Sequence, residues 1–293
     1  MIESFLRYLQ FEKRYSNHTL EAYRRDLSQF TDYLKETFEI SDFHESEHVH
    51  LRGWIVSQIE SGISPRSVNR KIATLKSFYK FLQSREHLVK NPASRLKPLK
   101  TEKKLPSFVR EAEIDNLLDQ IEYSDDFEGL RDKLILELLY GTGIRLAELI
   151  GLKDQDINNF QENIKVLGKR NKERVIPIGK NLVQLIKRYK EKRQLEVFEE
   201  MNRFLLVTNS GQQLYPMFVY RLVKKYLQLV TTLSKKSPHV LRHTFATHLL
   251  NKGADLNAVK DLLGHTSLAA TQVYTHNSME KLKSVFDQAH PKA

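Results

Sequence analysis

One stretch decides how this chain is interpreted: Pro238-His239-Val240-Leu241-Arg242-His243, followed by Leu262-Leu263-Gly264-His265 and then Tyr274. His239 and Arg242 lie three residues apart, so on a helix they project from one face. The guanidinium of Arg242 can donate two N–H bonds to the non-bridging oxygens of a phosphate. A phenol held nearby, such as that of Tyr274, can then attack the phosphorus. The stretch therefore predicts phosphodiester chemistry through a covalent tyrosine.

The composition is that of a globular protein with room for two domains. The chain has 293 residues, of which 40% are hydrophobic and 28% are charged, enough for two cores of ordinary size. It has no run near the roughly 18 uncharged apolar residues of a membrane span, and its first residues lack a signal-peptide pattern. Because it contains no cysteine, disulfides, zinc thiolate sites and cysteine nucleophiles are excluded. We expect a cytoplasmic protein without a membrane partner.

Positive charge is concentrated in the C-terminal half of the chain. The formal net charge is +11, and residues 201–254 contain no Asp or Glu. Residues 111–162 are instead rich in acids. A basic face beside an acidic one is typical of nucleic-acid binding proteins. A solvated basic surface is the alternative, and anionic membranes are less favoured because no strongly amphipathic basic helix with aromatic anchors is present.

The N-terminal part of the chain, residues 1–94, is predicted to be a helical domain. Apolar residues recur at helical spacing from Phe5 onward, over Thr19–Phe30 and over His50–Ile59. A fourth helix is predicted to begin with Ser64 as N-cap and Pro65 as its first residue. Four cations of this helix lie off its apolar stripe and predict a face for a phosphate backbone: Arg66, Arg70, Lys71 and Lys76.

Residues 95–106 are predicted to link this domain to a second one, residues 107–293. The linker carries two prolines and five Lys or Arg residues, with little that could form a core. In the second domain we expect helices over Arg110–Ile121, Glu128–Tyr140 and Leu146–Gly151, and a last helix near Glu280–Gln288. Strands are predicted over Asn163–Leu167, Glu173–Ile178 and Phe204–Val207, the first two joined by the turn Gly168–Lys172.

Two further cations are candidates for phosphate chemistry. Arg145 follows Gly141 and Gly143 at the start of a helix, where free backbone N–H groups favour an anion. It is a second candidate phosphate clamp, with an ordinary pairing to Glu148 as the alternative. Lys169, at the tip of the predicted hairpin, can reach a leaving oxygen as a general acid, although a lysine in a turn is usually only solvated.

The histidines of the C-terminal part allow a metal interpretation, which we do not favour. His239 and His243 have the His-x3-His spacing of helical metal ligands. However, residues 201–254 offer no carboxylate to complete a site, and the neighbouring cations repel a divalent ion. We therefore expect no metal and no other cofactor. The phenol of Tyr274, with an ordinary pKa of about 10, needs nearby cations or a base to become a nucleophile.

Five motifs lie in order along the chain: Thr142–Arg145 with Glu148-Leu149, Gly168-Lys169 with Asn171–Arg174, His239–His248, Leu262–His265, and Tyr274–His276. Their order and separations resemble the tyrosine recombinase (phage integrase) family, and the whole chain is closest to its Xer subfamily. Residues 285–291 lean toward the XerC branch rather than XerD. The resemblance implies a mainly α fold with a small β-sheet. An N-terminal helical core-binding (SAM-like) domain and a C-terminal α+β catalytic domain would form a clamp on DNA.

The resemblance also implies a role for each matching residue. Arg145 and Arg242 would bind the non-bridging oxygens of the scissile phosphate, and Tyr274 would attack it to form a 3′-phosphotyrosyl link. Lys169 would protonate the 5′ leaving oxygen. His239 would assist proton transfer at the tyrosine, and His265 would donate a hydrogen bond to the phosphate. All six positions carry the expected residue types; a departure is Arg170, where many relatives have glycine.

The resemblance implies a site-specific recombinase that resolves chromosome dimers through a Holliday junction. It would act on double-stranded DNA sites as a homo- or hetero-tetramer, with an XerD-like recombinase as candidate second subunit and a DNA translocase as candidate activator. Three alternatives stay open: an integrase of a phage or mobile element, a relaxing enzyme of the type IB topoisomerase kind, and a DNA-binding regulator with an inactive site. We expect no arm-binding domain before residue 1, an expectation that favours the Xer type over larger integrases.

Overall fold

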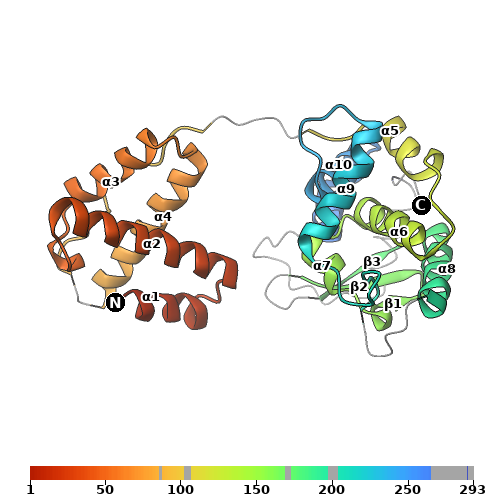
Figure 1. The fold of residues 1–293 in the computed structure, drawn as a ribbon, viewed down its shortest axis with the longest axis horizontal. Coiled ribbons are helices and arrows are strands. Elements are labelled where there is room, and N and C mark those ends of the chain that lie inside the picture. Colours follow the sequence, from red (N-terminus) through yellow and green to blue (C-terminus); the bar gives the residue numbers. More distant parts are fainter. Residues whose placement is uncertain (86–87, 102–106, 169–172, 197–203, 265–288, 290–293) are drawn as a thin grey trace. The chain divides into compact units, whose positions relative to one another are not determined.

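The chain folds into two units, which are considered separately. The computed structural model describes all residues except 86–87, 102–106, 169–172, 197–203, 265–288 and 290–293 (Figure 1). The first unit comprises Met1–Lys104 and the second Leu105–Ala293. None of the helices in the described part of the chain is long and apolar enough to span a membrane.

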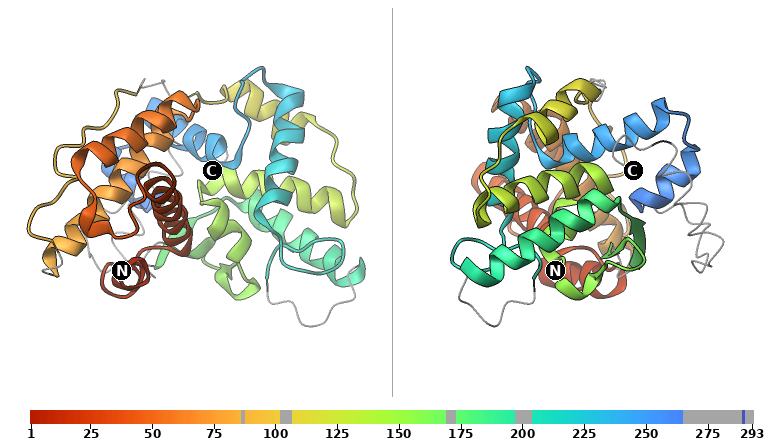
Figure 2. Two further views of the ribbon diagram at one scale, coloured as in Figure 1. Left: turned by 60° about the vertical axis from the view of Figure 1, so that its left-hand side comes forward. Right: turned by 90° about the vertical axis from the view of Figure 1, so that its right-hand side faces the viewer.

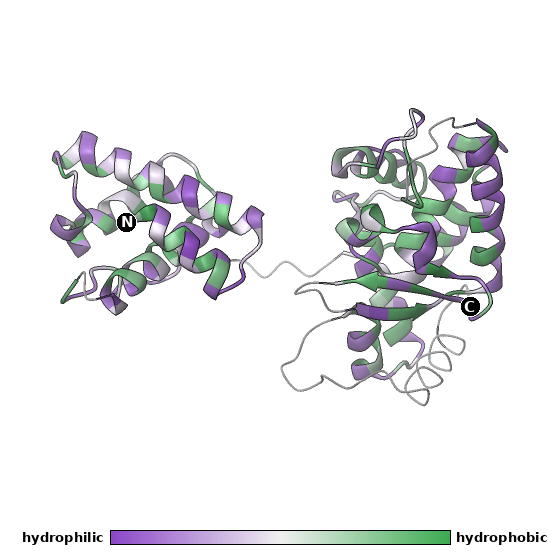
Figure 3. Ribbon diagram, turned by 90° about the horizontal axis from the view of Figure 1, so that it is seen from below, coloured by the Kyte–Doolittle hydropathy of each residue, from purple (hydrophilic) through white to green (hydrophobic). Residues whose placement is uncertain are grey.

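The first unit is built from helices around an aromatic core. Its helices are α1 (Ile2–Arg7), α2 (Asn17–Phe38), α3 (His48–Glu60) and α4 (Pro65–Ser84), with a π-helical turn at Tyr8–Glu12 and a 3-10 turn at Phe43–Glu45. The core contains Phe30, Trp54 and Phe78, all nearly inaccessible to solvent. Hydrophobic and hydrophilic residues alternate around these helices (Figure 3), so each helix can pack one side inward and keep the other in water.

Helix α4 begins where the sequence predicts, but its cationic face differs from the prediction. Pro65 is its first residue, and the Ser64 hydroxyl accepts a hydrogen bond from the Ser67 amide at 3.4 Å. Lys71, however, is only 3% exposed. Its ammonium lies 3.4 Å from a carboxylate oxygen of the buried Asp26 and 4.9 Å from the centre of the Trp54 ring. The prediction of a four-residue cationic face is wrong at Lys71, because a partner on α2 draws this lysine into the core.

Part of the segment predicted as a linker is attached to the first unit. Leu96 is 6% exposed and belongs to its hydrophobic core, so the expectation that residues 95–106 contribute little to a core is wrong at this position. Leu99, three residues after Leu96, makes two backbone hydrogen bonds with the side chain of Asn69 on α4. The side-chain amide of Asn69 donates to the Leu99 carbonyl at 2.9 Å, and the Asn69 side-chain oxygen accepts from the Leu99 amide at 2.7 Å. The chain is thus attached to α4 up to Leu99.

The second unit combines helices with a small antiparallel sheet. Its helices are α5 (Glu111–Asp115), α6 (Phe127–Thr142), α7 (Leu146–Gly151), α8 (Lys180–Glu196), α9 (Pro216–Val230), α10 (Pro238–Asn251) and α11 (Leu256–Leu263). A π-helical turn, Asn116–Gln120, continues α5. Helix α6 lies in the middle of the unit, with α8 and α10 packed against it (Figures 1 and 2). The mainly helical fold with a small sheet agrees with the expectation.

The sheet has the order β1-β2-β3, with β1 at Ile157–Asn158, β2 at Asn163–Leu167 and β3 at Glu173–Pro177. Strands β2 and β3 match the predicted hairpin, and Val166 faces Arg174 in their register. The short strand β1 was not predicted. The predicted strand Phe204–Val207 is wrong, because Phe204 and Val207 form only isolated bridges with Lys153 and Gln213. The predicted turn residues Lys169–Lys172 and the last helix, Glu280–Gln288, lie outside the described residues.

Candidate active site

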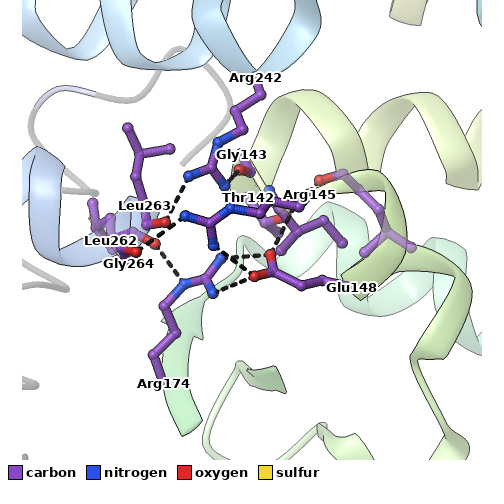
Figure 4. A network of polar contacts seen from close by, with 11 residues as sticks. Thr142, Gly143, Arg145, Glu148, Arg174, Arg242, Leu262, Leu263 and Gly264 are labelled. Atoms are coloured by element: carbon purple, nitrogen blue, oxygen red, sulfur yellow. Dashed lines mark hydrogen bonds and ion pairs between the residues drawn. The ribbon is translucent and has the colours of Figure 1, made fainter. Parts of the chain in front are cut away.

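Arg242 is held in the second turn of α10 and is almost fully buried. Helix α10 begins at Pro238, a residue suited to a first helical position because its missing N–H has no partner there. The side chain of Arg242 is directed at two backbone carbonyls: Nη1 donates to Gly143 at 2.5 Å and Nη2 to Leu263 at 2.6 Å (Figure 4). A guanidinium carries five N–H donors, so these two bonds leave further donors for an anion.

Arg145 lies beside Arg242, at the N-cap of α7 (Figure 4). Its backbone amide donates to Glu148 Oε2 at 2.7 Å and its Nη1 to Glu148 Oε1 at 2.8 Å. Nη2 reaches the carbonyl of Gly264 at 3.1 Å. The side chain is 26% exposed, in contrast to the buried Arg242. The pairing with Glu148 predicted as the alternative is therefore present, and it fixes Arg145 next to the other candidate clamp residue.

A third arginine at this place was not singled out from the sequence. Arg174, on β3, makes a two-pronged ion pair with Glu148, with both N–O distances at 2.9 Å. Its Nε donates to the Leu262 carbonyl at 2.9 Å. Both side chains of the pair are 4% exposed. The alternation of the strand could have indicated that Arg174 is buried. Arg174 and the buried Ile176 are two residues apart and so point to the same face of the sheet.

The end of α11 supplies one carbonyl to each arginine. Leu262, Leu263 and Gly264 are consecutive, and their carbonyls accept from Arg174, Arg242 and Arg145 respectively. The last carbonyls of a helix have no partner within it and carry partial negative charge, so they attract cations. Gly264 has a φ of +62° and a Cβ there would lie 3.1 Å from Arg174 Cδ, so a larger residue would strain this turn.

Gly143, at the end of α6, also supplies a carbonyl to an arginine and also has a positive φ. It has a φ of +59°, and a Cβ at this position would lie 2.5 Å from the ring of Phe245. That contact is too close for any side chain, so glycine is needed for the turn that leads from α6 to Arg145. The same turn aims the Gly143 carbonyl at Arg242. Gly143 therefore supports the arginine cluster, which we define as Arg145, Arg174 and Arg242.

The arginine cluster carries more positive than negative charge. Burial alone would raise the pKa of Glu148, but the hydrogen bonds and charge of Arg174, together with Arg145, lower it to about 2. Burial, followed by the charge of Arg145, lowers the pKa of Arg242 to about 10, so it stays protonated at neutral pH. Three guanidiniums around one carboxylate leave two positive charges in excess, which favours a bound anion such as phosphate.

The other predicted site residues are placed as follows. His239 lies in the first turn of α10 and is exposed, whereas Arg242 on the same helix is buried. Lys169, His265 and Tyr274 lie outside the described residues, so their positions relative to the arginine cluster stay predictions. In the sequence, Lys169 precedes Arg174 by five residues and His265 directly follows Gly264.

His248, another histidine of α10, joins two helices. It is 2% exposed, and its Nδ1 lies 3.0 Å from the hydroxyl of Tyr140 on α6. Burial lowers its pKa, so the ring is neutral at pH 7. The nearby Thr244 hydroxyl accepts a hydrogen bond from the Val109 amide at 3.0 Å. These contacts hold α10, and with it Arg242, against the rest of the unit.

Comparison with known proteins identifies the class of enzyme. Residues 107–281 match the model of the phage integrase family, and residues 2–86 match that of the phage integrase N-terminal SAM-like domain. Together these matches cover most of the chain. The chain belongs to the phage integrase (tyrosine recombinase) family, whose members break and rejoin DNA.

Within this family, the chain is similar over nearly its full length to proteins named XerC. The chain is 40% identical to the tyrosine recombinase XerC of Chlorobaculum parvum, over 100% of this chain and 94% of that protein. It is also 40% identical to XerC of Staphylococcus carnosus, over 99% of this chain and 97% of that one.

Two solved structures share the fold. The recombinase XerH, in a post-cleavage complex with its palindromic difH substrate, has a TM-score of 0.72 at 23% identity, covering 90% of this chain and 78% of that one. The integrase of transposon Tn1549, in complex with circular intermediate DNA, has a TM-score of 0.68 at 22% identity, covering 96% and 98%. At such identities the likeness concerns the fold alone.

Proposed function

We propose that this chain is a site-specific recombinase of the XerC type, which resolves chromosome dimers at a dif-like DNA site. Support comes from the similarity to XerC proteins over the full length of the chain. The observation that carries the proposal is the placement of Arg145 and Arg242 side by side, each fixed by hydrogen bonds and each with donors that the described residues do not take up. Such a pair can receive both non-bridging oxygens of one phosphate.

The reaction begins with attack of the Tyr274 phenol oxygen on the scissile phosphorus. The new O–P bond forms as the bond to the 5′ oxygen breaks, which leaves a 3′-phosphotyrosyl link and a 5′-hydroxyl end. His239 assists removal of the phenol proton, and Lys169 gives a proton to the departing 5′ oxygen. His265 donates a hydrogen bond to a phosphate oxygen. These four roles follow from family motifs, and the experiment below tests the role of Tyr274.

The charge of the arginine cluster suits the transition state of the attack by Tyr274. A phosphodiester carries one negative charge, and attack by a phenolate brings a second onto the pentacoordinate phosphorus. The two excess positive charges of the cluster match that charge, and fixed donors in a buried site need no reorganisation during the reaction. The phosphotyrosyl bond retains the free energy of the broken diester. A 5′-hydroxyl of the partner strand can therefore reverse the reaction and complete the exchange without an energy-supplying cofactor.

Strand exchange between two sites requires several subunits. We propose a tetramer on two DNA sites that exchanges one pair of strands to form a Holliday junction and then the other pair. The second type of subunit would be an XerD-like recombinase, and a DNA translocase is the candidate activator. Since its substrate is the chromosome, the protein would act in the cytoplasm.

A suicide DNA substrate tests the proposal. A nick close to the scissile phosphate lets the short 5′ fragment diffuse away, so a covalent protein–DNA adduct accumulates and can be separated by denaturing electrophoresis. We expect an adduct with the unaltered chain and with the control Tyr189→Phe, a buried tyrosine of α8, and none with Tyr274→Phe. An adduct that persists in Tyr274→Phe would contradict the nucleophile. Relaxation of supercoiled DNA that lacks any recombination site would favour a topoisomerase-like enzyme instead.

A further inference from the structure

Arg174 is a buried cation of the arginine cluster for which the reaction above provides no role. All three of its nitrogens are engaged: Nη1 and Nη2 with the two oxygens of Glu148, and Nε with the carbonyl of Leu262. Its side chain is 4% exposed. A guanidinium whose nitrogens are already bound to the protein is poorly suited to grip a substrate, but it can hold other groups in place.

One of those groups is Arg145, which Arg174 reaches through Glu148. Each carboxylate oxygen of Glu148 serves both arginines: Oε1 accepts from Arg174 Nη1 and Arg145 Nη1, and Oε2 accepts from Arg174 Nη2 and the Arg145 amide. The ion pair with Arg174 therefore fixes both the position and the rotation of the carboxylate. Glu148 in turn fixes the backbone and the side chain of Arg145 (Figure 4).

The other group is the turn at the end of α11. Arg174 Nε donates to the carbonyl of Leu262, and its Cδ, Nη1 and Nε lie 3.1–3.3 Å from the position that a Cβ of Gly264 would take. The two carbonyls that follow Leu262 accept from Arg242 and Arg145. By holding the first carbonyl of the turn, Arg174 fixes the acceptors of both clamp arginines.

We propose that Arg174 is a positioning residue for phosphate activation: it orients Arg145 through Glu148, and orients both Arg145 and Arg242 through the Leu262–Gly264 turn. This inference rests on the proposed function and adds to it a residue without contact to DNA. The geometry requires arginine, because a lysine has a single nitrogen and cannot make the two parallel bonds to Glu148 together with the bond to Leu262.

The variants Arg174→Lys and Arg174→Met of the full chain test this role. Single-turnover cleavage is measured on the suicide substrate at saturating DNA, and DNA affinity is measured separately. Displacing a catalytic group by a fraction of an ångström to one ångström costs on the order of 10²-fold in rate. We expect a fall of that order in the cleavage rate constant for both variants, with less than about a threefold change in Kd. A misfolded fraction lowers the amplitude of the reaction and leaves the rate constant of the folded fraction unchanged.

A neutral substrate separates positioning of the clamp from general loss of stability. In a methylphosphonate, a methyl group replaces one charged non-bridging oxygen, so the clamp arginines have less charge to neutralise. We expect the Arg174 variants to lose much less rate on a methylphosphonate than on the phosphodiester. The matched control is Arg193→Met. Arg193 lies outside the arginine cluster and binds Asp154 and the carbonyls of Phe204 and Leu205, so its loss should leave the ratio between the two substrates unchanged.

A double-mutant cycle with Arg145→Ala supplies the second criterion. If Arg174 acts partly through Arg145, the rate loss of the double variant should be clearly smaller than the product of the two single losses, and the remaining loss reflects the orientation of Arg242 by the same turn. The inference is overturned by a near-normal rate for Arg174→Lys, by equal losses on the two substrates, or by rate losses that multiply in the cycle. Failure of the proposed function gives a different result: neither the unaltered chain nor Arg193→Met would form an adduct.

Discussion

Replacing Glu148 with glutamine removes the charge that Arg145 and Arg174 share, and the cost can be derived from the structure. The pKa of Glu148 lies at about 2, against an ordinary value of 4.5. A difference of about 2.5 pH units corresponds to about 3 kcal/mol of folding free energy at neutral pH. This magnitude agrees with the roughly 3–5 kcal/mol lost when one partner of a buried ion pair is removed. We therefore expect Glu148→Gln to lower the free energy of unfolding of the second unit by about 3 kcal/mol at pH 7.

The stabilisation by Glu148 should decrease as the pH falls. A carboxylate whose pKa is depressed in the folded protein stabilises it fully above the unfolded-state pKa, and this stabilisation is lost as the pH falls toward the folded-state value. For Glu148 that range extends from about 4.5 down to about 2. By pH 3.5 about 1.4 kcal/mol should already be lost, so the difference between the unaltered chain and Glu148→Gln should shrink accordingly.

Urea unfolding of both proteins at several pH values between 7 and 3.5 measures the effect. The control is Glu173→Gln, which removes an exposed carboxylate paired with Lys165 on the neighbouring strand; exposed pairs contribute no more than about 1 kcal/mol. Equal stability of Glu148→Gln and the unaltered chain at pH 7 would refute the reasoning. So would a difference that stays constant down to pH 3.5.

Three further predictions concern the clamp, the absence of a metal requirement and the linker. Arg242→Ala should slow cleavage of the suicide substrate by about 10²–10³-fold, the range for removal of a donor to a developing charge, and an unchanged rate would remove Arg242 from the clamp. EDTA should leave cleavage by the unaltered chain within about twofold, since arginines supply the charge that metal ions supply in two-metal nucleases; inhibition would revive the metal interpretation. Asn69→Ala should speed hydrogen exchange of the Leu99 amide by about tenfold, as expected for the loss of roughly 1–1.5 kcal/mol of hydrogen bonding, and unchanged exchange would show that Asn69 does not hold the linker.

Local signals in the sequence were sufficient for most of the fold. Ser64 and Pro65 start α4 by supplying an N-cap and a residue that needs no hydrogen bond at the first position. The period of two over β2 and β3 identified the hairpin. The pairing of Arg145 with Glu148 was also predictable, because three residues along a helix start bring the two side chains together.

Contacts between distant residues account for what the sequence did not reveal. Lys71 lies off the apolar stripe of α4, but its partner Asp26 is 45 residues away. Arg174 is one of many cations in its region, and only the fold brings it to Leu262, 88 residues further on. The apolar run Phe204–Val207 resembles a strand, yet its neighbours Lys153 and Gln213 each pair with a single residue. Periodicity in the sequence indicates which side chains are buried and which face they point to. It does not indicate which distant residue each side chain contacts.

The most direct test of the central claim identifies the two atoms joined in the covalent intermediate. The adduct formed on the suicide substrate is digested with protease and nuclease, and the remaining peptide is sequenced by mass spectrometry. We predict that the peptide carrying the nucleotide contains Tyr274, linked through its phenol oxygen to a 3′-phosphate, while the released strand has a free 5′-hydroxyl. A nucleotide attached to any other residue, or through a 5′-phosphate, would contradict the proposed mechanism.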